Sequence, residues 1–289
     1  MSTAAFDYHR PASIDEAIQL LQQHGEDAKL LAGGHSLVPA MKLRLATTAN
    51  LIDIGHLDAL KYIREDGNAL AIGAATTHWE IESSDLVKEK APLLAQTAAV
   101  IGDLQVRNKG TIGGSLAHAD PAGDLPAVVV ALAAKLVTSS TGDHRTIEAD
   151  DFFVDLLTTD LRPTEILSEI SIPGLPPHTG TAYAKFGNKA SHYAVVGVAA
   201  VVTVGADGVC QSARIGVTGA GPKAVRAASA EDALTGSNLD DSAISAAAGL
   251  AGDGITDFNE DVHASAEYRA HLVTVYAARA IRAAASRAS

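Results

Sequence analysis

The sequence predicts an α+β protein with two parts, and three observations support this class. A strand–helix–strand order near the start indicates a small parallel sheet, and hairpin signals after it indicate a second sheet. A Pro/Gly cluster at residues 173–180 then precedes an antiparallel meander and alanine-rich helices. We therefore expect a first domain over 1–177, with subdomains of about 1–57 and 58–177, and a C-terminal α/β domain over 178–289 with a three-stranded antiparallel sheet.

The first subdomain begins with an amphipathic helix. Ser13 and Glu16 form a capping box, and apolar residues recur at helical spacing until Gly25, which ends the pattern. Strand, helix and strand are then expected at residues 29–31, 37–45 and 50–54. This order predicts parallel strands, because the intervening helix returns the chain to the same end of the sheet.

A hairpin with its turn at Gly67 opens the second subdomain, and a capping box follows at residues 77–80. A helix is expected from Pro92 until Gly102. Further strands are predicted at residues 134–140, 145–147, 166–172, 182–186, 193–204 and 212–217, and further helices at 230–234, 241–250 and 265–285.

The composition excludes several classes of protein. The net charge of −12 and the lack of a basic stripe argue against a nucleic-acid partner. The single Cys210 excludes an internal disulfide framework, and it also excludes an iron–sulfur cluster on this chain, since such a cluster normally needs several cysteine ligands. No apolar run is long enough to span a membrane, and the first residues lack the pattern of a signal peptide, so we predict a cytoplasmic protein.

Two glycine-rich segments are candidates for phosphate binding. Residues 32–36 and 111–115 each combine adjacent glycines with a hydroxyl, so backbone N–H groups can approach a ligand where no side chain intervenes. A ligand with a central pyrophosphate fits two such segments better than one, although a tight turn between strand and helix would explain the first segment by itself. Asp120 and Asp124 follow the second segment and can accept hydrogen bonds from a ribose or ribityl hydroxyl.

Other combinations of side chains give weaker predictions. His118, Asp120 and Asp124 are residue types that bind divalent metals, but the neighbouring glycine segment and the Asp-Pro turn explain them better, so we predict no metal site. Cys210 has no His or Asp placed by sequence to activate it, and we interpret it as a strand residue. We identify no catalytic side chain in this chain.

Residues 32–45 and 105–121 resemble motifs of the FAD-binding medium subunit of molybdenum-containing hydroxylases, the family of carbon monoxide dehydrogenase medium subunits and xanthine dehydrogenase FAD subunits. The resemblance covers essentially the whole chain, with further similar positions at 165–167, 185–186, 191–197 and 265–269. It implies an FAD-binding fold of the vanillyl-alcohol-oxidase type, in which the two subdomains of 1–177 hold FAD between them and 178–289 forms the C-terminal domain of the medium-subunit family.

The resemblance also implies which residues contact FAD. Both glycine segments would hold the pyrophosphate, Asp124 would bind a polar group, and Tyr193 would stack on the isoalloxazine, with a core position in a strand as its alternative. FAD is expected to be non-covalent, so His35 is interpreted as a loop residue and not as a covalent tether. Ser115 stands where family members often carry Asn, and both side chains can donate a hydrogen bond. The complete set is Ala32, Gly33, Gly34, His35, Ser36, Ile101, Thr111, Ile112, Gly113, Gly114, Ser115, Asp124, Leu167, Lys185 and Tyr193.

The activity implied by the resemblance is electron transfer within an oxidoreductase. The chain would be the FAD-carrying subunit of a heterotrimer, whose large subunit binds molybdopterin and whose small subunit carries 2Fe–2S centres, assembled as a dimer of heterotrimers. FAD would take electrons from the iron–sulfur centres and pass them to an external acceptor. Two alternatives stay open: a stand-alone flavin oxidase or reductase of the same fold group, and a scaffold subunit without FAD.

Overall fold

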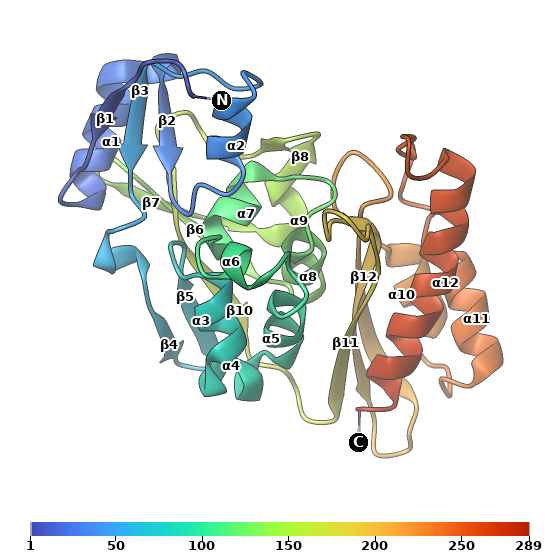
Figure 1. Ribbon diagram of the computed structural model, residues 1–289. Helices are drawn as coiled ribbons and strands as arrows, with labels where there is room; N and C mark the ends of the chain where they lie inside the picture. Colours follow the sequence, from blue (N-terminus) through green and yellow to red (C-terminus); the bar gives the residue numbers. More distant parts are fainter. Residues whose placement is uncertain (1, 289) are drawn as a thin grey trace.

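The computed structural model describes residues 2–288, which form three sheets and a short two-stranded ribbon surrounded by helices (Figure 1). The first sheet is parallel, in the order β1-β3-β2, as the strand–helix–strand pattern predicted. Its outermost strand, β1, escaped prediction because it has three mostly exposed residues. The elements are β1 (Asp7–His9), α1 (Ile14–His24), β2 (Ala28–Leu31), α2 (Leu37–Lys42) and β3 (Asn50–Asp53), with a 3-10 turn at Gly25–Asp27.

Residues close in the sequence determine where helices α1 and α2 begin and end. The Ser13 hydroxyl accepts a hydrogen bond from the Glu16 backbone N–H, while the Glu16 carboxylate accepts one from Ala12 and not from Ser13. The helix ends at Gly25, whose φ of +54° suits a residue without a side chain. Helix α2 is shorter than the sequence indicated, because Arg44 adopts a φ of +63° that ends the helical path.

The second sheet is antiparallel throughout, in the order β4-β5-β10-β6-β7. Helices α3, α4, α5, α7 and α8 contribute to the main hydrophobic core together with this sheet. The bounds of the strands are β4 (Ile63–Asp66), β5 (Ala69–Gly73), β6 (Lys135–Ser140), β7 (Asp143–Glu148) and β10 (Ile166–Pro173), with the ribbon β8 (Phe153–Asp155) and β9 (Thr158–Thr159). The helices are α3 (His78–Ser83), α4 (Asp85–Lys90), α5 (Pro92–Ala98), α6 (Leu104–Arg107), α7 (Ile112–His118), α8 (Leu125–Ala131) and α9 (Ala149–Phe152), with a 3-10 turn at Asp58–Leu60.

The third sheet is an antiparallel meander that is covered on both faces. Its long central strand is buried over almost its whole length, as the continuous apolar run indicated. Helix α12 packs on one face of the sheet, and α8 of the preceding region contacts strands β12 and β13 (Figure 1). The elements are β11 (Thr179–Gly187), β12 (Ala194–Val204), β13 (Cys210–Thr218), the two-residue edge strand β14 (Val225–Arg226), α10 (Ala228–Leu234), α11 (Asp241–Gly249) and α12 (Ala266–Ala285).

None of the helices between residues 2 and 288 is long and apolar enough to cross a membrane.

Gly180 in β11 allows α12 to pack directly against the strand, because a Cβ at this position would overlap the carbonyl oxygen of Ala284. We expect Gly180→Ala to lower the free energy of unfolding by about 1–3 kcal/mol, as overpacking of a core does, measured by urea titration. Gly249→Ala is the matched control: its Cβ would meet no heavy atom within 4 Å and it lies in α11. That change should raise stability by roughly 0.5–1 kcal/mol. Equal effects of the two changes would contradict the close packing of α12.

Candidate functional site

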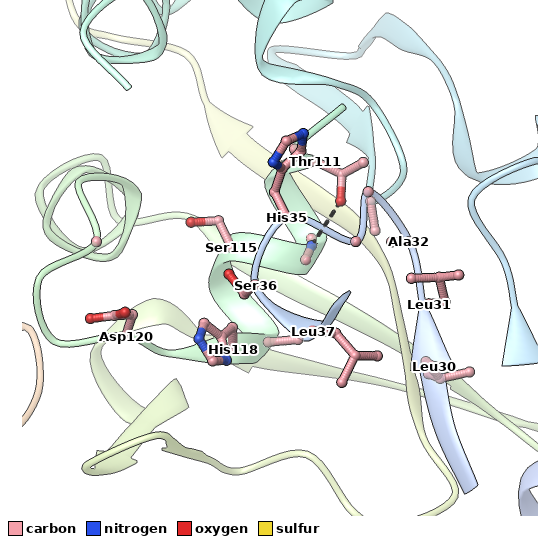
Figure 2. A pocket seen from close by; sticks show the side chains of 18 of the residues that line it. Leu30, Leu31, Ala32, His35, Ser36, Leu37, Thr111, Ser115, His118 and Asp120 are labelled. Atoms are coloured by element: carbon pink, nitrogen blue, oxygen red, sulfur yellow. Dashed lines mark hydrogen bonds between the residues drawn. The ribbon is translucent and has the colours of Figure 1, made fainter. Parts of the chain in front are cut away.

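A cavity of about 600 Å³ lies where segments from all three sheets meet. Its walls come from the β2–α2 connection, the start of α7, the loop before α8, the start of β10 and the turn before β12. The side chains of Ser36, Ser115, His118 and Asp120 project into the same region (Figure 2). A cavity of this size is in the range of sites for small-molecule ligands and cofactors.

The first glycine segment offers open hydrogen-bond donors. Gly33 lies against the backbone of Lys109, since a Cβ on Gly33 would overlap the Lys109 carbonyl oxygen. Gly34 has a φ of +77°, which a residue with a side chain rarely adopts. Within residues 2–288, the backbone N–H groups of residues 33–36 donate to no protein acceptor. These four N–H groups are therefore free to bind an anionic ligand in the cavity.

The second glycine segment is built differently from the expectation. It is the first turn of α7 and not a loop, with Thr111 as the N-cap residue. Thr111 Oγ1 accepts a hydrogen bond from the Gly114 N–H at 3.1 Å, drawn as a dashed line in Figure 2. The N–H groups of residues 112, 113 and 115 donate to the carbonyl oxygens of Thr76, Ala74 and Thr111. The expectation of a second set of free N–H groups is therefore wrong, because backbone and hydroxyl acceptors of the chain already bind them.

Asp124 forms a buried ion pair at the edge of the cavity. Its carboxylate accepts hydrogen bonds from Lys185 Nζ at 2.8 Å and from the Tyr183 hydroxyl at 2.5 Å. Burial raises the pKa of Asp124, and the Lys185 ammonium works in the opposite direction. Burial also raises the pKa of Tyr183 well above its ordinary value. Both carboxylate oxygens of Asp124 thus have partners within the chain.

Tyr193 reaches the cavity from the turn before β12 and is partly exposed. Burial raises its pKa, as does the carboxylate of Asp120, while the Ser36 side chain lowers it. The phenol is therefore neutral at physiological pH. Tyr193 thus brings the third sheet to the same cavity that the first glycine segment lines.

The structure brings most of the predicted residues together around this cavity. Ile112 is the first exception: it is fully buried in the main core and does not line the cavity. Lys185 is the second, because it lines a neighbouring cavity of about 490 Å³. The predicted residues that do line the main cavity are Ala32, Gly33, Gly34, His35, Ser36, Ile101, Thr111, Gly113, Gly114, Ser115, Asp124, Leu167 and Tyr193.

Sequence reasoning missed several titratable residues in the cavity wall, and two of them, His78 and Glu165, have shifted pKa values. His78 is 4% exposed, and burial, with the nearby Arg107 and His35, lowers its pKa to about 4. Glu165 is held by Arg145 through hydrogen bonds of 2.7 and 2.8 Å, which lower the pKa of the carboxyl. The capping box identified His78 only as the first residue of a helix, and nothing local indicated that it would line a cavity.

No group of three His, Cys, Asp or Glu side chains within residues 2–288 is arranged to hold a metal ion, the trio of His118, Asp120 and Asp124 included.

Comparison with known proteins identifies the class of this protein. Residues 4–175 match the family described as the FAD binding domain in molybdopterin dehydrogenase, and residues 181–284 match the carbon monoxide dehydrogenase flavoprotein C-terminal domain. The fold and the site thus define an FAD-binding component of an oxidoreductase. The chain belongs to the family of FAD-binding medium subunits of molybdenum hydroxylases, which confirms the resemblance seen in the motifs.

Two relatives and one solved structure show how far the similarity extends. The carbon monoxide dehydrogenase medium chain of Hydrogenophaga pseudoflava is 41% identical, over 98% of each chain. The alpha subunit of the 6-hydroxypseudooxynicotine dehydrogenase complex of Paenarthrobacter nicotinovorans is 38% identical, over 100% of this chain and 97% of the relative. A solved structure of the Hydrogenophaga pseudoflava carbon monoxide dehydrogenase that lacks the Mo-pyranopterin moiety matches with a TM-score of 0.97 and 42% identity, over 100% of both chains. The predicted fold class is confirmed.

Burial of His78 makes the free energy of unfolding depend on pH. Its pKa is about 4 in the folded chain, whereas the ordinary value of 6.5 applies to the unfolded chain. The unfolded chain therefore binds the proton more tightly, and stability is lost as pH falls from 6.5 to 4. The total loss is about 3 kcal/mol, since each pKa unit corresponds to about 1.4 kcal/mol.

We expect His78→Gln to lose less stability over this pH range than the unchanged chain, measured by urea unfolding without FAD at several pH values. His263→Gln, at an exposed position, is the control and should follow the unchanged chain. Identical acid sensitivity of the His78→Gln variant and the unchanged chain would exclude a buried neutral His78.

Proposed function

We propose that the chain binds FAD non-covalently in the 600 Å³ cavity and carries electrons from iron–sulfur centres of a partner chain to an external acceptor. The observation that carries the proposal is the row of four free backbone N–H groups at residues 33–36, in a cavity that the Thr111 and Ser115 side chains also line. Such donors fit a pyrophosphate, and the glycines keep side chains away from it. FAD supplies the redox chemistry, and the protein supplies binding, orientation and shielding from water.

The proposed binding residues divide by chemistry. Residues 32–36 would bind the pyrophosphate through backbone N–H groups, whereas Thr111 and Ser115 would contribute hydroxyls. Tyr193 would cover one face of the isoalloxazine ring, because a partly exposed phenol at the cavity wall can stack on a flat aromatic ring. Asp124, fixed by its ion pair with Lys185, would place a polar group at the edge of the flavin site, and Ile101 and Leu167 would supply apolar contacts.

The single cysteine of this chain and the names of its relatives support the proposed partner chains. One cysteine cannot ligate an iron–sulfur cluster, so such a cluster would be held by a small 2Fe–2S subunit, and molybdopterin by a large subunit. Relatives are named as medium chains or as subunits of a dehydrogenase complex, which supports a multi-subunit assembly. We propose that this assembly is a heterotrimer, present as a dimer of heterotrimers. The lone Cys210 forms no internal disulfide, which is compatible with the cytoplasm.

We also propose the domain division at residues 177 and 178. The link between β10 and β11 contains this point and joins the second sheet to the third. Residues 1–177 would then be the FAD-binding domain and residues 178–289 the C-terminal domain.

Purification of the full chain from its native source tests the proposed function against both alternatives. We expect a yellow protein that copurifies with a molybdopterin chain and an iron–sulfur chain. Acid precipitation should release the flavin into the supernatant, because no covalent bond holds it. Yellow protein that turns over substrate without partners would support a stand-alone oxidase or reductase, colourless protein would support a scaffold, and flavin in the acid pellet would refute non-covalent binding.

Gly33→Ala tests the placement of the first segment. The added methyl group would push the segment away from Lys109, so we expect the dissociation constant of FAD to rise about tenfold or more, a loss of about 1.4 kcal/mol. Flavin fluorescence titration of the full chain measures this change. Gly249→Ala, outside the cavity walls, should bind FAD normally. Normal FAD affinity in the Gly33→Ala variant would contradict the proposed role of residues 33–36.

A further inference from the structure

Arg269, in the first turns of α12, is a buried cation that does not line the cavity. Its side chain is 5% exposed. Nη1 donates to the carbonyl oxygens of Val195 at 2.6 Å and Gly219 at 2.8 Å, and Nη2 donates to Asp261 Oδ2 at 2.7 Å. Nε is buried and has no acceptor within residues 2–288. One guanidinium therefore joins two strand ends to a loop carboxylate.

The cost of this arrangement points to a role beyond stability. The guanidinium loses its hydration on burial, whereas its one carboxylate partner, Asp261, is 45% exposed, so the pair by itself is weak evidence for net stabilisation. Nε adds a further cost, because a buried donor without an acceptor is unfavourable. The segments that Arg269 holds in place are the ends of β12 and β13.

Both carbonyl oxygens belong to strand ends that are hydrogen-bonded to the loop before α8. Val195 follows Ala194, whose N–H donates to the Ala122 carbonyl at 3.0 Å. Gly219 donates its N–H to the Pro121 carbonyl at 2.6 Å, and the hydroxyl of Thr218 donates to the same carbonyl at 2.8 Å. The two strand ends that accept hydrogen bonds from Arg269 are thus themselves hydrogen-bonded to the loop at residues 121–123.

The strand ends approach each other closely at this point. Gly219 has a φ of +83°, and a Cβ on it would lie 2.6 Å from the Val195 carbonyl oxygen. Two carbonyl dipoles that converge in this way repel each other unless a cation or donor lies between them. Nη1 of Arg269 occupies that position, because it donates to both oxygens. A lysine could not match this contact, since its single nitrogen lacks the planar fork that also reaches Asp261.

The segments held by Arg269 carry side chains of the cavity wall. Tyr193 lies two residues before Val195, and Asp120 and Asp124 flank residues 121–123. Figure 1 shows α12 running alongside β11 and β12, so the helix braces the strands from the side opposite to the FAD-binding region. We propose that Arg269 is a positioning residue for the flavin pocket, which fixes Tyr193 and the Asp120–Asp124 loop relative to each other. The inference rests on the proposed function, because it takes FAD as the ligand of the cavity.

The test compares Arg269→Gln with the unchanged full chain. We expect the dissociation constant of FAD to rise about tenfold. The fluorescence of bound flavin should increase, because Tyr193 would be less firmly placed against the ring. Arg282→Gln is the matched control on the same helix, since Arg282 pairs with the exposed Asp241, and it should leave both quantities unchanged.

A double variant separates positioning from a purely structural role. In a chain that already carries Tyr193→Leu, Arg269→Gln should cause no further increase in flavin fluorescence, because the ring that it positions is gone. An additive increase would refute the proposal. So would a lower free energy of unfolding of Arg269→Gln with unchanged FAD affinity and unchanged fluorescence.

Asp261→Asn is a second variant for the case in which Arg269→Gln does not fold. This change removes only the charge that faces Nη2, and it should shift FAD affinity and fluorescence in the same direction by a smaller factor. Unchanged values would refute the positioning role. Failure of the unchanged chain to bind FAD would refute the proposed function and this inference together, whereas normal FAD binding by the Arg269 variants would refute this inference alone.

Discussion

The cavity depends on one close contact, between Gly33 and the backbone of Lys109. Because Gly33 has no side chain, the β2–α2 connection can lie directly against the segment that leads into α7. This contact brings free N–H groups from the first sheet into one cavity with hydroxyls from the second. Any larger residue at position 33 would separate the two walls. The cavity is thus built from two units that are unable to form it separately.

The two glycine segments have different physical roles. Between residues 2 and 288 no protein acceptor binds the N–H groups of residues 33–36, so these residues retain donors for an anion. The first turn of α7 has its N–H groups bonded to Ala74, Thr76 and Thr111, which attach this turn to the chain around β5 and α3. Residues 33–36 therefore have donors for a ligand, whereas residues 112–115 are held in position by the chain. Because the first turn of α7 is already fixed, less of the chain has to become ordered when a cofactor binds, and the entropic cost of binding is lower.

The third sheet takes part in the same site. Tyr193 enters the cavity from the start of β12, and Lys185 on β11 pairs with Asp124 of the preceding region. Gly216 lets α8 approach β13 closely, since a Cβ there would overlap the carbonyl oxygen of Ala127. The walls of the cavity and the C-terminal region therefore share packing as well as hydrogen bonds. This sharing explains how Arg269, on the far side of the sheet, can influence the cavity.

The sequence by itself determined the features that arise from neighbours along the chain. The caps at Ser13 and Thr77, the hairpin at Gly67, the buried strand β12 and the family motifs all depend on residues a few positions apart. Only the tertiary structure decided how distant groups pair. In the folded chain, the N–H groups in the first turn of α7 donate to protein acceptors, and Ile112 and His78 are buried. Asp124 is paired with Lys185. Apart from the bonds that Thr111 accepts from residues 114 and 115, these outcomes depend on partners tens of residues away, and local sequence patterns carry no information about such pairings.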